Sequence, residues 1–140
     1  MEPPPLEWTQ IISLSNAALL TFPNAADWLG RRAEAYQWLN NPTAVLADWE
    51  QVTIISPTNH GAWYQLGLAR QALNDLPGAQ QAFETATQFD GEQHLEYYVA
   101  LARVYEQLDL LEQAKATYRI AQRIDPENKS IEQTLLRLGE

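Results

Sequence analysis

One pattern of residues limits what this chain can fold into, and it is clearest between residues 60 and 90. Bulky and small side chains recur there at helical spacing on two stripes: Trp63, Leu66 and Gly67, then Ala79, Phe83 and Ala86. The segment Asn74–Gly78 between the stripes is rich in residues that favour turns. The pattern predicts two antiparallel amphipathic helices. Because so small a pair cannot bury its apolar stripes alone, it needs similar neighbours.

The same pattern recurs 34 residues earlier and 35 residues later. The earlier copy contains Leu29, Ala33, Tyr36, Val45, Trp49, Val52 and Pro57, and the later one contains Tyr98, Leu101, Ala102, Tyr105, Ala114, Tyr118, Ala121 and Pro126. This spacing resembles the tetratricopeptide repeat, a helix-turn-helix unit of about 34 residues. The resemblance implies an all-α fold, an α–α superhelix in which antiparallel helix pairs stack as a solenoid. Arg70 departs from the family pattern, which prefers Tyr there, and is either a stem covering apolar surface or half of a buried ion pair.

In this register we expect one domain over residues 8–140. It would comprise a half repeat (8–25), repeat 1 (26–59), repeat 2 (60–94), repeat 3 (95–128) and a capping helix (129–140), after a flexible proline-rich segment (1–7). The half repeat depends on Ala18 and Pro23, because both lie 34 residues before their counterparts in repeat 1. Ser15 stands where an aromatic is usual, so the alternative is a helix that merely packs on the first hairpin. Asn24 is the expected cap of the following helix, and the extra residue before repeat 3 is expected in an exposed joint at Asp90.

Composition excludes several classes of function. The net charge is −9, with three basic and eleven acidic residues in 1–100, so a polyanion such as nucleic acid would be repelled. The chain has no cysteine, hence no disulfide or thiolate site. No apolar run is long enough for direct membrane insertion, and the N-terminus does not resemble a secretory signal. We therefore expect a cytoplasmic protein or one in another soluble compartment.

Residues that could carry chemistry are sparse. The two histidines, His60 and His94, begin the first helices of neighbouring repeats, which packing would separate by about 10 Å, too far to share an ion. Serines lack a partnered histidine, and carboxylates such as Glu50 and Glu84 fall on expected helix surfaces. The sequence predicts no enzyme, no catalytic residue, no metal and no cofactor.

In the family that the chain resembles, the first helices of the repeats line a concave groove that binds peptides or helices of partner proteins. Trp38 is either a turn-packing residue or an exposed anchor. The groove positions, with Trp38 included, are Asp27, Gly30, Arg31, Glu34, Gln37, Trp38, Tyr64, Gln65, Leu68, Gln71, Glu96, Val99, Arg103 and Glu106, and Gln133 and Arg137 of the capping helix are further candidates.

One subclass of the family captures a C-terminal carboxylate with Lys and Asn at groove positions. The matching positions of this chain hold neither Lys nor Asn. They are occupied by Gly30, Glu34, Leu68, Glu96 and Ala100. We therefore expect a neutral or basic protein segment as partner. The leading hypothesis is a protein-interaction module acting as adaptor, scaffold or assembly factor. The alternatives are a self-associating structural unit, with a homo-oligomer as its product, and an RNA-binding helical repeat.

Overall fold

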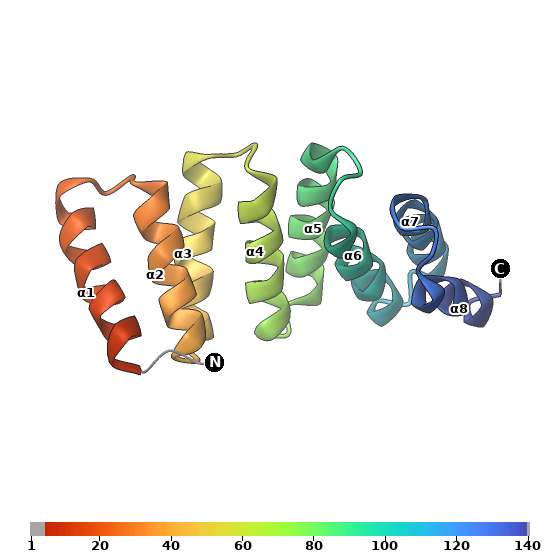
Figure 1. The fold of residues 1–140 in the computed structure, drawn as a ribbon, viewed down its shortest axis with the longest axis horizontal. Helices are drawn as coiled ribbons and strands as arrows, with labels where there is room; N and C mark the ends of the chain where they lie inside the picture. Colours follow the sequence, from red (N-terminus) through yellow and green to blue (C-terminus); the bar gives the residue numbers. More distant parts are fainter. Residues whose placement is uncertain (1–4, 140) are drawn as a thin grey trace.

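The computed structural model describes residues 5–139, with side chains from Glu7 onward, and within this range the chain is helical with no strand. Figure 1 shows the helices in chain order. They are α1 (Pro5–Thr21), α2 (Ala26–Trp38), α3 (Pro42–Ile55), α4 (His60–Ala72), α5 (Leu76–Asp90), α6 (Leu95–Gln107), α7 (Leu111–Ile124) and α8 (Lys129–Arg137). The expected flexible segment 1–7 lies partly outside the described residues, and α1 already begins at Pro5.

The helices form an extended stack rather than a bundle. Among the described residues, the helices in substantial contact are neighbours in sequence, from α1 against α2 through to α7 against α8. In Figure 1, α1 and α8 accordingly lie at opposite ends of the molecule. The predicted hairpins are α2–α3, α4–α5 and α6–α7. The all-α solenoid of antiparallel helix pairs is confirmed, and its stability should depend on contacts between adjacent units.

The hairpin α4–α5 closes where a small residue faces a large one. Phe83 is fully buried, and a methyl group at Gly67 would lie 2.4 Å from its ring, closer than any real contact. The small residues Ala79 and Ala86 are fully buried on the same stripe as Phe83. The predicted pattern of small and bulky residues is therefore what lets α4 and α5 approach and still fill the space between them.

The turns within the hairpins repeat in the same register. Asn40, Asn74 and Asp109 adopt left-handed backbone conformations, with φ of 54°, 61° and 59°. Asn and Asp tolerate this conformation better than other non-glycine residues. The next backbone N–H then donates to the carbonyl five residues back: Asn41 to Tyr36 (2.9 Å), Asp75 to Arg70 (2.9 Å) and Leu110 to Tyr105 (2.8 Å). The spacing of 34 and 35 residues is thus present in the backbone as well as in the side chains.

Several helices begin with a side-chain cap. The capping oxygens belong to Asn41, Asn59, Asp75 and Asn128, each accepting from the backbone N–H three residues on. The expected cap at Asn24 is wrong. The residue before α2 is Ala25, which offers no side-chain acceptor, because the four-residue connection ends one position later than the sequence suggested.

The extra residue before repeat 3 does not lie in an exposed joint, which corrects the sequence-based expectation. Four residues separate α3 from α4, α5 from α6 and α7 from α8, so these connections are equal in length. Helix α5 is instead one residue longer than α3 and α7, and it ends at Asp90, whose side chain is fully buried. Gly91 follows with φ of 68° and ends the helix in the left-handed conformation, which glycine adopts without strain.

The two ends of the stack are single helices. Helix α1 packs on α2, and Ser15 is fully buried at the register position that Trp49 and Phe83 occupy further along. This is the packing that a half repeat would give, and the repeat boundaries stay a prediction. Helix α8 buries Ile131 and Leu135 against the last hairpin. Neither α1 nor any other helix of the described range is both long and apolar enough to cross a bilayer.

Candidate functional site

The predicted groove residues lie on α2, α4 and α6, and none of them is sealed inside the core. Tyr64, Leu68 and Val99 are half-buried and pack against the main hydrophobic cluster with part of each side chain open. The half-buried positions are Gly30, Tyr64, Gln65, Leu68, Gln71, Val99 and Glu106, and the exposed ones are Asp27, Arg31, Glu34, Gln37, Trp38, Glu96 and Arg103. The face therefore offers apolar surface next to polar and charged groups.

Three predicted residues meet at one pocket of about 130 Å³, where the end of α2 faces α4. Gln37, Gln65 and Leu68 line it. The remaining lining residues are Asn40, Asn41, Pro42, Val45, Ala69 and Ala72. Apolar carbon thus forms the walls, while amide groups supply hydrogen-bond donors and acceptors. Sequence reasoning missed the contribution of the α2–α3 turn, because the register predicts helix faces but not how a turn folds back toward the next repeat.

A second pocket of about 190 Å³ lies between α1 and α2. Arg31 and Glu34 line it together with Trp8, Ile11, Leu14 and Trp28. The Arg31 guanidinium lies 5.7 Å from the centre of the Trp28 ring. Of the predicted groove residues of α2, Gln37 lines the first pocket, and Arg31 and Glu34 line the second. The others, Asp27, Gly30 and Trp38, line neither pocket.

Trp38 takes part in a stacking pair. Its ring lies parallel to that of Trp8, with centroids 5.4 Å apart, while 51% of its surface remains exposed. Trp38 therefore packs against Trp8 of α1 and keeps an open face, and its role as an anchor for a partner stays a prediction.

The predicted groove residue Glu106 is hydrogen-bonded to the last helix of the stack. Its carboxylate accepts hydrogen bonds from Tyr118 (2.7 Å) and from Arg137 of α8 (2.7 Å). Burial would raise the pKa of Glu106, but these bonds and the charge of Arg137 lower it below its usual value. The capping candidate Arg137 therefore contacts the groove helix α6, as a link between the last hairpin and its cap.

An aromatic cluster fills the face between α4 and α6. Tyr64 stacks on Tyr97 with centroids 4.5 Å apart, and Tyr97 stacks on His94 at 4.8 Å. Burial and the charge of Glu96 raise the pKa of the Tyr64 hydroxyl. Tyr97 was not a predicted groove residue: it stands where repeat 2 has the buried Ala62, and it is itself buried.

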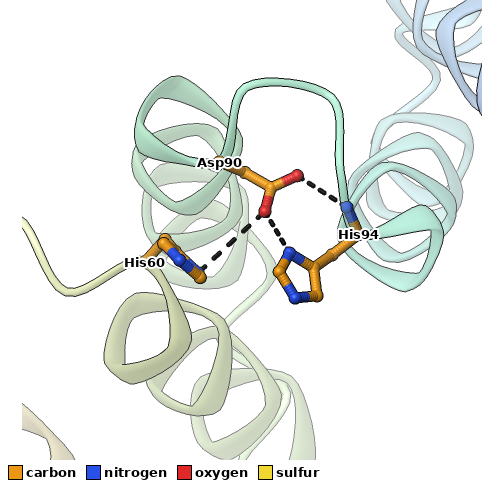
Figure 2. A group of neighbouring side chains, drawn as sticks. All are labelled: His60, Asp90 and His94. Atoms are coloured by element: carbon orange, nitrogen blue, oxygen red, sulfur yellow. Dashed lines mark hydrogen bonds and ion pairs between the residues drawn. The ribbon is translucent and has the colours of Figure 1, made fainter.

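The two histidines are much closer than the sequence suggested. The ring centroids of His60 and His94 lie 5.2 Å apart, with the Asp90 carboxylate between them (Figure 2). The expected separation of about 10 Å is wrong because it holds for helix axes, and both imidazoles extend from their backbones into the same space. The carboxylate beside both imidazoles belongs to Asp90, which sequence reasoning did not pair with either histidine.

Two ion pairs support the groove helices. Arg32 donates to both carboxylate oxygens of the buried Asp48, at 2.9 and 2.6 Å, and also to Asn16 at 2.7 Å. The hydrogen bond to Asp48 is the main reason that the pKa of Arg32 is raised. Arg70 lies 3.6 Å from Glu50 and donates to the carbonyl of Gly78 at 3.1 Å. Arg70 is thus half of an ion pair, whose acid Glu50 is partly exposed rather than buried.

Sequence reasoning missed the pair of Arg32 and Asp48. A signal for it existed, because Arg32 replaces the Leu66 of repeat 2 and Asp48 replaces Ala82. Two opposite charges at neighbouring apolar positions of one hairpin are best explained by pairing.

Comparison with known proteins agrees with this arrangement. A tetratricopeptide-repeat family model matches residues 60–93 and 95–128, the hairpins α4–α5 and α6–α7 with their connections. The heat-shock protein cognate co-chaperone sgt12 of Aspergillus fumigatus is 33% identical over 85 residues, which are 61% of this chain and 25% of that protein. This chain thus spans only a quarter of the relative's length.

Solved structures give the same fold. A crystal structure of MamA protein superposes with a TM-score of 0.87 at 19% identity, covering 94% of this chain and 72% of that one. The first TPR domain of Spaghetti (RPAP3), bound to the HSP90 peptide SRMEEVD, superposes with a TM-score of 0.72 at 17% identity over 81% of this chain and 89% of that one. At these identities the likeness shows the fold alone. The repeat match identifies residues 60–93 and 95–128 as tetratricopeptide repeats, and the stacked hairpins share the fold of these solved structures.

Proposed function

We propose that this chain is a non-enzymatic protein-interaction module that binds a peptide or helical segment of another protein along α2, α4 and α6. It would act as an adaptor, scaffold or assembly factor. The match to tetratricopeptide repeats supports interaction with proteins. The relative sgt12 is named a co-chaperone, and the structurally similar RPAP3 domain is bound to an HSP90 peptide.

The pocket between α2 and α4 is the observation that carries the proposal. Its volume of about 130 Å³ is similar to that of a cavity of about 150 Å³ that accommodates benzene. An aliphatic or aromatic side chain of a partner would enter against Leu68 and Val45. The amides of Gln37 and Gln65 lie on the lining, where they would bond the partner's backbone.

Charge favours a neutral or basic segment. The groove positions include four acidic residues, Asp27, Glu34, Glu96 and Glu106, against the two basic residues Arg31 and Arg103. The HSP90 peptide SRMEEVD carries three acidic residues and a terminal carboxylate. Because the Lys and Asn of the carboxylate-binding subclass are absent here, an acidic tail of that kind should bind poorly.

A displayed library of short peptides tests the proposal. Tyr64 and Leu68 also pack against the core, so their removal would confuse binding with folding. We therefore suggest Gln65→Arg, which fills the pocket with a long charged side chain, and the matched control Gln88→Arg at an exposed position of α5.

We expect the unmodified chain to enrich peptides with one apolar anchor flanked by basic residues. Gln88→Arg should retain them and Gln65→Arg should lose them, while all three keep the same helix content. Enrichment that survives Gln65→Arg, or a selection for acidic C-terminal peptides, would refute the proposal.

Self-association is a second candidate, favoured by exposed apolar residues at the N-terminal end of the stack. Leu20 is 88% exposed and Phe22 64%, and Leu14 of α1 is also exposed. In a solenoid such a face is where a further helix would stack. Sedimentation across a dilution series should then show a concentration-dependent mass that the double change Leu20→Ser/Phe22→Ser abolishes. A constant monomer mass would exclude this candidate and leave the groove proposal intact.

A further inference from the structure

The joint between the second and third hairpins brings three potential metal ligands together. One ligand atom from each of His60, Asp90 and His94 can be chosen so that all lie within 4.8 Å of one another. The residues come from three places: the first position of α4, the last position of α5 and the residue before α6 (Figure 2). The groove function does not require this cluster.

Each of the three residues departs from the repeat pattern. Asp90 ends α5, the helix that carries the extra residue before repeat 3. His94 occupies the position where Asn59 and Asn128 cap their helices, yet its side chain makes no capping hydrogen bond. His60 stands where the third repeat has Leu95. Departures at three separate positions that meet at one point indicate a role that is specific to this joint.

The orientation of the groups suits a cation. One oxygen of Asp90, Oδ2, already accepts backbone N–H bonds from Gln93 and His94, at 2.8 Å each, which fixes the carboxylate. The other oxygen, Oδ1, faces both imidazoles: it contacts Nδ1 of His94 and lies 4.0 Å from Nδ1 of His60. The carboxylate is fully buried, whereas 40% of each histidine side chain is exposed, so an ion could reach the site from solvent.

We propose that His60, Asp90 and His94 bind a divalent ion of the zinc class, with two imidazole nitrogens and one carboxylate oxygen as ligands. Two neutral imidazoles and a carboxylate are ligands that Zn²⁺ prefers, and three protein ligands leave a fourth tetrahedral position for water. Ligands about 2.0–2.1 Å from an ion lie roughly 3.4 Å apart in a tetrahedron. Rotation of the half-exposed His60 ring would shorten the 4.0 Å separation between its Nδ1 and Oδ1 of Asp90. The direct contact between Oδ1 of Asp90 and Nδ1 of His94 would have to open so that the ion enters between them.

The ion would connect three helices at the joint between adjacent hairpins. It would replace the hydrogen bond between Nδ1 of His60 and the hydroxyl of Tyr97, which are 3.1 Å apart. Tyr97 also stacks on Tyr64 and His94, so the site is continuous with the aromatic cluster of α4 and α6. Binding would thus fix the angle between the second and third hairpins and favour one curvature of the stack.

Titration of the full chain with ZnCl₂ after treatment with a chelator tests the proposal. Because His60 and His94 are the only histidines in the sequence, all the imidazole nitrogen signals in an NMR spectrum, two from each ring, report on this site alone. We expect one saturable equivalent of Zn²⁺ per chain, shifts of the imidazole signals of both rings, and tetrahedral absorption bands when Co²⁺ replaces Zn²⁺.

The variants His60→Gln and His94→Gln should each weaken Zn²⁺ binding by at least about tenfold, since each removes a direct ligand. Both positions are partly exposed, so circular dichroism should show both variants folded. The control Glu127→Gln removes an exposed charge from the connection between α7 and α8, away from the site, and should leave Zn²⁺ affinity unchanged. Absence of saturable binding, or an affinity that neither histidine variant alters, would overturn the proposal.

Discussion

Gly67 gives the sharpest test of how these helices pack. In Gly67→Ala the new methyl carbon would lie 2.4, 2.5 and 2.9 Å from three ring carbons of Phe83, which is itself fully buried and enclosed by the core. Overpacking of this kind costs about 1–3 kcal/mol. Because three ring atoms clash at once, we expect the upper end, about 3 kcal/mol. The higher helix propensity of alanine stabilises the folded chain by about 1 kcal/mol and offsets part of this cost. The net expectation is a loss of about 2 kcal/mol in the free energy of unfolding.

Gly30→Ala is the matched control. Gly30 lies on α2, where a methyl group would meet Trp49 at 3.4 Å, an ordinary contact. The gain of about 1 kcal/mol in propensity should therefore appear almost undiminished. Urea and thermal unfolding followed by circular dichroism should give a melting temperature lower by roughly 8 °C for Gly67→Ala and higher by up to roughly 4 °C for Gly30→Ala. Equal responses of the two glycines would refute the packing argument.

Three further predictions concern the ion pairs and the end of the stack. Arg32→Leu leaves the buried Asp48 without its partner and should cost about 3 kcal/mol, whereas Arg32→Leu/Asp48→Ala should recover most of that loss in a urea titration. The pKa of Glu106 is lowered in the folded chain, so its contribution to stability is complete above its ordinary pKa of about 4.3 and is lost as the pH falls through the lowered value. Glu106→Gln should therefore make stability, measured by circular dichroism, depend less steeply on pH in acid. An unchanged pH dependence would contradict the stabilising role given to the Glu106 carboxylate. Deleting residues 129–140 removes the contacts of Ile131 and Leu135 with the last hairpin, so hydrogen exchange should become faster in α6 and α7 and stay unchanged in α2 and α3. Equal acceleration in all helices would mean that the chain unfolds as one unit, against the nearest-neighbour account.

The repeat register explains why the fold could be predicted from sequence. The position of Gly67 holds a small residue in every hairpin, namely Ala33, Gly67 and Ala102, so several copies supply independent support for one packing arrangement. The positions of Tyr64, Leu68 and Val99 on an open face follow from the same register, since the helix period fixes which side of α4 and α6 they occupy. Their role in binding remains a proposal.

The register could not predict features that depend on departures from it. The extra residue before repeat 3 could lie anywhere in the connection by sequence alone, and only the equal lengths of the connections place Asp90 at the end of α5. The approach of His60 and His94 depends on side-chain direction, which an estimate from helix spacing omits. Arg32 and Asp48 lie on two different helices that pack together, and they form their ion pair across that contact. In the sequence the pair shows only as two charged residues at positions where repeat 2 has apolar ones.

Hydrogen exchange of the full chain, with and without a peptide selected from the library, tests the central claim most directly. If the groove binds the peptide, protection should increase in residues 26–38, 60–72 and 95–107, which form α2, α4 and α6. The second helices of the hairpins, α3, α5 and α7, should change little. Protection concentrated on α3, α5 and α7, or confined to the ends of the stack, would contradict the account.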